Sequence, residues 1–258
     1  MQEARSGKAK QNGFPDRKGA GGITEKMGRC MTDGAKRALR WAIPLILMPL
    51  LVILGGWKLG DRFYAWGILG MVILTQALFL TGFERQTVGS RRLVIAAVMT
   101  ALSVLGRILF APLPGFKPIT AIVVITGVWI GGETGFLVGA LSALISNIFS
   151  GQGPWTPFQM FAWGMIGLGA GLVSGWLKKS RAALAAYGVF AGVAYSLFMD
   201  IWTVLWYNGN LSWPLYTAAV VTALPYMASY AASNVIFLLL LGRPFGQKLE
   251  RIRIKYGV

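Results

Sequence analysis

The sequence predicts an all-α membrane protein, a polytopic bundle of about eight helices that cross a lipid bilayer. Three observations predict this class. Only 13% of the 258 residues are charged and 55% are hydrophobic, whereas a water-soluble domain carries roughly 25% charged residues. Several apolar runs approach the roughly 20 residues that a helix needs to span a bilayer. The 34 glycines and 10 tryptophans also fit membrane helices, which use glycine for close packing and tryptophan at the interfaces.

The apolar runs predict the individual helices in order along the chain. The expected bounds are Trp41–Gly56, Tyr64–Phe83, Leu93–Phe110, Ile119–Ile130, Gly135–Phe149, Pro157–Leu177, Ala183–Trp206 and Pro214–Leu241. The fourth and fifth helices are short for a full crossing, which predicts tilting or a local break. The eighth contains Pro225, which removes a backbone donor and should kink the helix.

These helices divide the chain into four parts. We expect a disordered basic cytoplasmic tail (1–40), two extra N-terminal transmembrane helices (41–83), a six-helix core (93–242) and a basic cytoplasmic tail (243–258). Lys and Arg gather in the two tails and in the loops after the second and sixth helices, and cytoplasmic segments carry such an excess. We therefore expect a multi-pass protein of the cell membrane with both termini in the cytoplasm. The net charge of +16 indicates this orientation rather than nucleic-acid binding.

The composition excludes several kinds of chemistry. There is no histidine, and the single cysteine is Cys30, so no Cys/His zinc site, intrachain disulfide or Ser–His nucleophile pair can form. No G-x-x-x-x-G-K-[ST] phosphate loop occurs. We expect no enzyme activity, no cofactor and no metal, and any uphill transport must draw its energy from a partner. An intramembrane lipid-modifying enzyme and an autonomous ion-coupled carrier are the alternatives, but the sequence has neither clustered catalytic groups nor several buried carboxylates.

Small residues form smooth faces on three of the expected helices. Ala97 and Ala101 are four residues apart and share a face of the third helix, where they predict either internal packing or the close approach of a partner helix. A glycine ladder on the sixth helix and another around the fourth loop predict packing within the bundle. The members of these ladders are Gly167, Gly171 and Gly175, and Gly131, Gly135 and Gly139.

Two ionisable residues lie inside the expected helices near the outer surface. Arg107 falls close to the end of the third helix, and Asp200 less than two turns from the end of the seventh. Such residues are costly in a membrane and are usually functional. Three roles are open: a structural ion pair between them, a pocket in which they hold a polar ligand, or snorkelling of Arg107 to the headgroups.

The outer loops hold the remaining candidates. The segment around residues 150–160 joins Gly and Pro to amides and aromatic rings, a mixture that suits a small-molecule site; the alternative is an interfacial aromatic belt around a tight turn. The loop 110–118 lies on the same side and is a candidate lid. The candidate substrate-binding residues are Arg107, Phe116, Lys117, Asn147, Gln152, Trp155, Thr156, Gln159, Trp163, Asp200 and Asn208.

The segments RILFAPLPGFKP (107–118) and GQGPWTPFQMFAWG (151–164), together with Ala97-x-x-x-Ala101, resemble the substrate-binding S components of energy-coupling factor (ECF) transporters, which import vitamins. The resemblance covers about Leu93–Gly242. It implies a six-helix core, a pocket near the outer face that is closed by loops, and docking of the small-residue helix on a transmembrane coupling subunit driven by two ATPase subunits. The first two expected helices lie outside that core.

The resemblance points to the family but says less about which substrate is bound. Aromatic and amide-rich segments suit a large planar or macrocyclic solute, so we favour a corrinoid such as cobalamin. A flavin such as riboflavin, or another heteroaromatic vitamin precursor, is the alternative.

Overall fold

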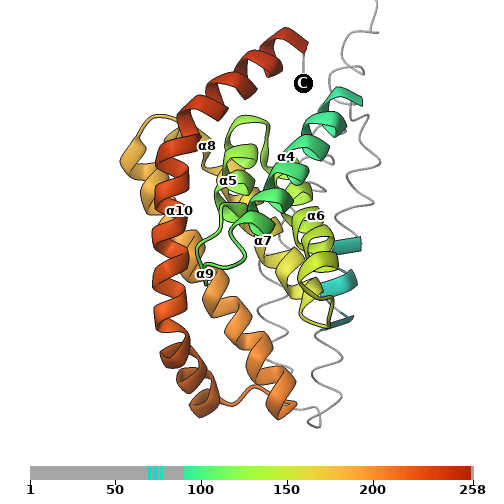
Figure 1. Ribbon diagram of the computed structural model, residues 1–258, viewed down its shortest axis with the longest axis vertical. Helices are drawn as coiled ribbons and strands as arrows, with labels where there is room; N and C mark the ends of the chain where they lie inside the picture. The colour runs from blue at the N-terminus through green and yellow to red at the C-terminus, as the bar shows by residue number, and fades with distance from the viewer. Residues whose placement is uncertain (1–68, 71, 75, 78–89, 257–258) are drawn as a thin grey trace, which may run out of the picture. The chain divides into compact units, whose positions relative to one another are not determined.

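The computed structural model describes residues 69, 70, 72–74, 76, 77 and 90–256, and its regular elements within these residues are all helices (Figure 1). The helices are α4 (Ser90–Leu109), α5 (Ile119–Trp129), α6 (Gly132–Ser150), α7 (Thr156–Leu172), α8 (Ser174–Leu177), α9 (Arg181–Asn208) and α10 (Trp213–Tyr256). The expected all-α class is therefore confirmed for the described part of the chain. The first expected helix, Trp41–Gly56, and the N-terminal tail lie outside the described residues.

Four of the described helices are long and apolar enough to cross a membrane, namely α4, α6, α9 and α10. α5 is apolar but has only 11 residues, as its short run predicts. The expectation of a short fifth helix was wrong, because α6 begins at Gly132 and ends at Ser150 and so spans 19 residues. Gly131, the residue just before α6, takes a φ of 136°. Residues other than glycine rarely adopt this conformation, so Gly131 makes the earlier start of the helix possible.

Two other expected helix ends were also wrong. The sixth helix breaks at Val173 into α7 and α8, after a stretch that is rich in glycine and therefore weak in helix propensity. The eighth helix does not end at Leu241. It continues to Tyr256, so the expected C-terminal tail is helical up to that residue.

The continuation of α10 has a packing cause. Gly242 faces Leu184, Gly246 faces the ring of Trp129, and Leu249 is buried, so this segment has its own apolar contacts with the bundle. Pro225 and Pro244 both lie inside α10, and Figure 1 shows the helix bending towards each of its ends. Helix bends at proline follow from the missing N–H and the bulk of the ring.

The centre of the bundle is the contact of α5, α6 and α7, where glycines let the backbones meet. A Cβ atom placed on Gly135 would lie 2.7 Å from Gly127 Cα and 2.7 Å from Gly167 O. Gly139 is equally close to the backbone of Trp163, and Gly171 to that of Gly132. These contacts confirm internal packing for most of both ladders. Gly175 is the exception, because no atom lies near its Cβ position.

The described residues of the second expected helix pack on the same bundle. Val72 is fully buried against an apolar cluster that includes Phe158 and Trp202. The Gln76 side chain donates a 2.7 Å hydrogen bond from Nε2 to Pro157 O, at the start of α7. Val72 and Gln76 therefore contact the bundle at and near the segment from which α7 begins.

The glycine contact yields a stability test. Gly135→Ala should lower the free energy of unfolding by about 1–3 kcal/mol, because the added methyl group overpacks a backbone contact. Gly175→Ala is the matched control, since the same methyl group there meets open space. Thermal unfolding of the purified variants in detergent measures both. Equal melting temperatures for the two variants would contradict the tight contact of α5, α6 and α7.

Candidate functional site

Arg107, in the last turn of α4, is the centre of a buried polar cluster. Its side chain is only 8% exposed. Nη1 donates hydrogen bonds to Ser146 Oγ and, at 2.8 Å, to Asn147 Oδ1. The guanidinium carbon lies 5.1 Å from the ring centroid of Trp163, which is a cation–π contact. Arg107 therefore points into the bundle, and the snorkelling alternative was wrong.

The cluster continues from α6 into the start of α7. Asn147 Nδ2 donates to Thr156 Oγ1 and to Gln159 Oε1, each at 2.9 Å. Thr156 Oγ1 in turn donates to Gln152 Oε1 at 2.9 Å. The structure therefore brings together the candidates Arg107, Asn147 and Gln159, which come from three different helices.

Aromatic residues form one wall of this cluster. Trp163 is fully buried and stacks on Tyr195, with 4.7 Å between ring centroids and 18° between ring planes. Tyr230 of α10 lies against Tyr195, with centroids 5.2 Å apart. Ser146, Tyr195 and Tyr230 were not predicted as site residues from the sequence. The sequence feature that could have identified them is a hydroxyl group within an apolar helix, because a buried hydroxyl group needs a polar neighbour.

The loop 110–118, expected to be a lid, is fastened to α10. Lys117 N donates to Ser233 Oγ at 2.9 Å, and Ser233 Oγ donates to Lys117 O at 3.0 Å. Ser229 Oγ donates to Pro114 O at 2.9 Å. Phe116 packs with Phe237 of α10 at 5.3 Å between centroids. The loop therefore holds the Lys117 backbone at a defined place beside the cluster.

The cluster is positively charged. Burial, and secondly the charge of Arg107, lower the pKa of Lys117. Between residues 90 and 256 the acidic residues are Glu133, Asp200 and Glu250. Glu133 lies 3.9 Å from Arg92, and Glu250 pairs with Lys178 at 3.0 Å. Neither of them is paired with the cations of the cluster.

Asp200 does not pair with Arg107, so the structural ion pair was also wrong. Asp200 is 8% exposed, and its Oδ2 has no hydrogen-bond partner among the described residues. Arg107 instead takes neutral oxygens as acceptors. The two ionisable groups were expected to meet because both lie near the same surface, but they belong to different helix interfaces.

The structure leaves three more candidates outside the hydrogen-bonded cluster. Trp155 is 37% exposed, and its ring lies over Gly153 of its own loop. Phe116 is held by Phe110 and Phe237. Asn208 is exposed and donates from Nδ2 to Asn210 in the loop after α9. Each is therefore a loop or packing residue in this structure.

Ala97 and Ala101, the candidate docking residues, are exposed on α4. Exposed apolar side chains continue the same face, among them Val94, Val98 and Leu105. We call this the α4 face. This exposure argues against internal packing of the two alanines among the described helices.

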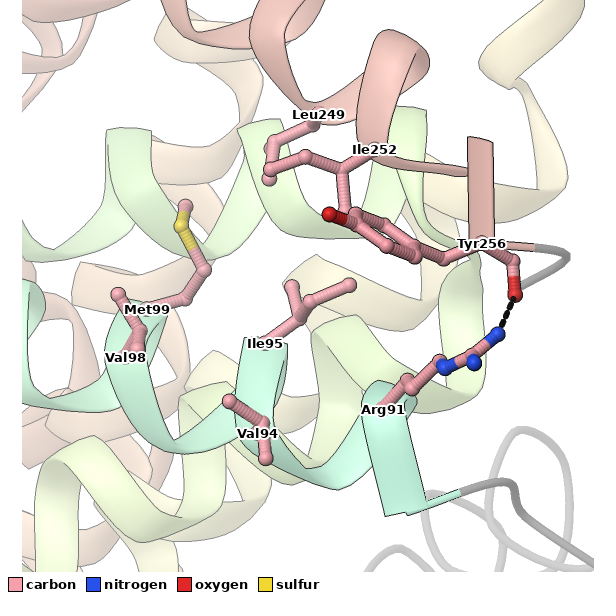
Figure 2. A pocket seen from close by; sticks show the side chains of 8 residues that line it. All are labelled: Arg91, Val94, Ile95, Val98, Met99, Leu249, Ile252 and Tyr256. Carbon is pink, nitrogen blue, oxygen red and sulfur yellow. Dashed lines mark hydrogen bonds between the residues drawn. The ribbon is translucent and has the colours of Figure 1, made fainter. Parts of the chain in front are cut away.

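A cavity of about 480 Å³ lies beside the α4 face, between the start of α4 and the last turns of α10 (Figure 2). Its lining residues are Arg91, Val94, Ile95, Val98, Met99, Leu249, Ile252 and Tyr256. Arg91 Nη1 donates to Tyr256 O at 2.9 Å and so links the two helices at the rim. The cavity is at the opposite end of α4 from Arg107, so it is not the polar site expected from the loops.

Comparison with known proteins gives a family match. The model of the family described as ECF transporter, substrate-specific component, matches residues 91–250. This range runs from the start of α4 into the last turns of α10 and includes the whole Arg107 cluster. No curated protein and no solved structure gives a match.

The unpaired state of Asp200 can be tested by neutralising it. Asp200→Asn should leave the folded yield unchanged or raise it, because the substitution removes a buried charge that has no counter-ion. Asn147→Ala should lower the yield, since it removes one hydrogen bond from each of Arg107, Thr156 and Gln159. Fluorescence-detected size exclusion and thermal unfolding report both. A clear loss of folded protein in Asp200→Asn would mean that the carboxylate has a stabilising partner.

Proposed function

The chain belongs to the family of substrate-specific components of energy-coupling factor (ECF) transporters, and on that premise we propose that it is the subunit that binds a vitamin for import. Members of this family are transport subunits rather than enzymes. They work with an ECF module, which comprises a coupling subunit and ATPases. We propose the same division of labour here. Two ATPase subunits would supply the energy, and this chain would bind the substrate and deliver it to the coupling subunit.

The observation that carries the proposal is the polar cluster around Arg107. It places a guanidinium group, two amides and two hydroxyl groups within an otherwise apolar helical bundle. Polar groups inside membrane helices are costly and commonly mark the path or the site of a substrate. A few converging polar groups beside aromatic walls are also the usual make-up of a small-molecule site. We therefore propose the Arg107 cluster as the substrate site.

The charge distribution supports an outward-facing position for this site. Basic residues gather at the other end of the described bundle, at the start of α4, around α8 and in the last turns of α10. By the positive-inside tendency that end is cytoplasmic, so the Arg107 end faces outwards. We propose that both termini lie in the cytoplasm of a multi-pass cell-membrane protein and that residues 41–83 are two helices added to the family core.

The substrate proposed from sequence likeness is a vitamin, with a corrinoid favoured over a flavin or another heteroaromatic precursor. The aromatic wall of Trp163, Tyr195 and Tyr230 suits a solute with a broad apolar part. The competing classes, a lipid-modifying enzyme or an autonomous ion-coupled carrier, would act without an ECF module. Uptake that depends on co-expressed coupling and ATPase subunits supports the proposal, whereas uptake by this chain alone would contradict it.

We propose that the α4 face docks on the coupling subunit. Ala97 and Ala101 leave a shallow groove on an exposed helix, which lets another helix approach closely. The cavity between α4 and α10 adjoins this face at its cytoplasmic end (Figure 2), and Val94 and Val98 belong to both. An apolar side chain of the coupling subunit would fit into this cavity.

The docking proposal predicts a separation of binding from transport. Replacing both Ala97 and Ala101 by Leu should abolish assembly with the coupling subunit and vitamin uptake, while the isolated chain still binds its vitamin. Ala182 and Ala186 are exposed on α9 with the same spacing, so the same double replacement there is the matched control and should leave uptake intact. Loss of vitamin binding in the α4 variant would mean that the alanines support the fold instead.

The site proposal predicts a specific loss of affinity. Gln159→Ala should weaken vitamin binding about ten-fold or more, the effect of losing one good polar contact, without loss of folded protein. Asn208→Ala is the matched amide control, because that side chain bonds only within its own loop. Isothermal titration of the purified variants measures both. Equal affinities in the two variants would remove the Arg107 cluster from the site.

A further inference from the structure

Arg107 is a buried cation without a counter-ion among the described residues. Its acceptors are a hydroxyl group and an amide. The acids Glu133 and Glu250 pair with other cations, and Asp200 makes no ion pair with it. A buried charge is expensive unless it is paired. A negatively charged group outside the described residues would offset part of this free-energy cost when the site is occupied.

Lys117, the second cation of the cluster, also has no counter-ion among the described residues. The Lys117 side chain is partly exposed and forms no ion pair with a described residue, and burial, then the charge of Arg107, lower its pKa. Its backbone is tied to Ser233 by two hydrogen bonds, so the side chain begins at a fixed place. Two neighbouring cations with no carboxylate between them repel each other, and an anion bound between them would remove that repulsion.

The guanidinium group also has an unused edge. Both of its hydrogen bonds leave from Nη1, and Nε and Nη2 donate to no described residue. Adjacent N–H groups of this kind match the two oxygens of a carboxylate or a phosphate group in a bidentate contact. Ser146, Asn147 and the ring of Trp163 hold the orientation of the group, so this edge is preset rather than free to turn.

We propose that the site selects a solute with a carboxylate or phosphate group, which binds the Nε–Nη2 edge of Arg107 and the ammonium of Lys117. The inference rests on the proposed function, because it assigns a substrate class to the same site. It narrows the substrate to anionic vitamins or precursors and disfavours those whose polar groups are only amides or hydroxyls.

The test uses the full-length chain, purified in detergent, and matched pairs of ligands that differ in one charge. The pairs are nicotinate with nicotinamide, biotin with its primary amide, and riboflavin 5′-phosphate with riboflavin, and water-soluble vitamins outside these pairs complete the panel. Titration gives the affinities. We expect tight binding of an anionic member, at least about ten-fold tighter than its uncharged form, the gain typical of a charge-assisted bidentate contact. The carboxylate and phosphate pairs distinguish the two sources of the anion.

Variants tie the preference to the two cations. Arg107→Gln should remove most of the discrimination between the members of the binding pair, and Arg107→Lys should retain part of it. Lys117→Gln should also reduce the discrimination several-fold. Lys117 lies in a loop that is held by backbone hydrogen bonds, so this variant should fold and keeps the test decisive if Arg107→Gln does not fold. Asn208→Ala should leave it unchanged.

The outcomes separate this inference from the function on which it rests. A neutral vitamin that binds as tightly as its anionic counterpart, or discrimination that survives both Arg107→Gln and Lys117→Gln, overturns the inference and leaves the vitamin-binding function standing. A folded chain that binds no member of the panel and does not assemble with an ECF module overturns the proposed function and the inference with it.

Discussion

The close contact of α5, α6 and α7 is the constraint on which the rest of the described structure depends. Glycines at 127, 135 and 167 bring three backbones to distances that any side chain would prevent. In a bilayer the lipid is as apolar as the helix surface, so close packing rather than hydrophobic exclusion has to hold helices together. This contact fixes the register of α6 against α7. That register sets where Asn147 meets Thr156 and Gln159, and where Trp163 lies beneath Arg107.

The charge distribution follows from the same solvent. Cations at the start of α4, around α8 and along the end of α10 lie where water and headgroups can reach them. Three of them form ion pairs with the acids available there, Glu133 and Glu250. At the other end of α4, Arg107 and Lys117 have no such partner in the described part of the chain. The bundle thus separates a basic surface, which suits membrane orientation, from a buried cationic centre, which suits a ligand. The α4 helix links the two, since its exposed face and its last turn serve different proposed partners.

Much of this arrangement was predictable from sequence. Composition and the length of the apolar runs gave the helical membrane class, and the glycine ladders gave the internal packing. Arg107, Asn147 and Gln159 were found because polar groups near helix ends stand out against apolar surroundings. What failed were features that depend on tertiary contacts. The end of α10 was placed too early because its packing through Gly242, Gly246 and Leu249 does not show in local hydropathy. The pairing of Asp200 with Arg107 failed because position along a helix does not say which neighbour a side chain faces. Tyr195 and Tyr230 were overlooked since they resemble ordinary aromatic core residues.

The most direct test of the account is a structure of the chain bound to its vitamin and assembled with an ECF module, determined by electron cryo-microscopy. We expect ligand density within hydrogen-bond distance of the Nε–Nη2 edge of Arg107, and the coupling subunit seated on the α4 face. Ligand density in the cavity between α4 and α10, with Arg107 bonded only to Ser146 and Asn147, would contradict it.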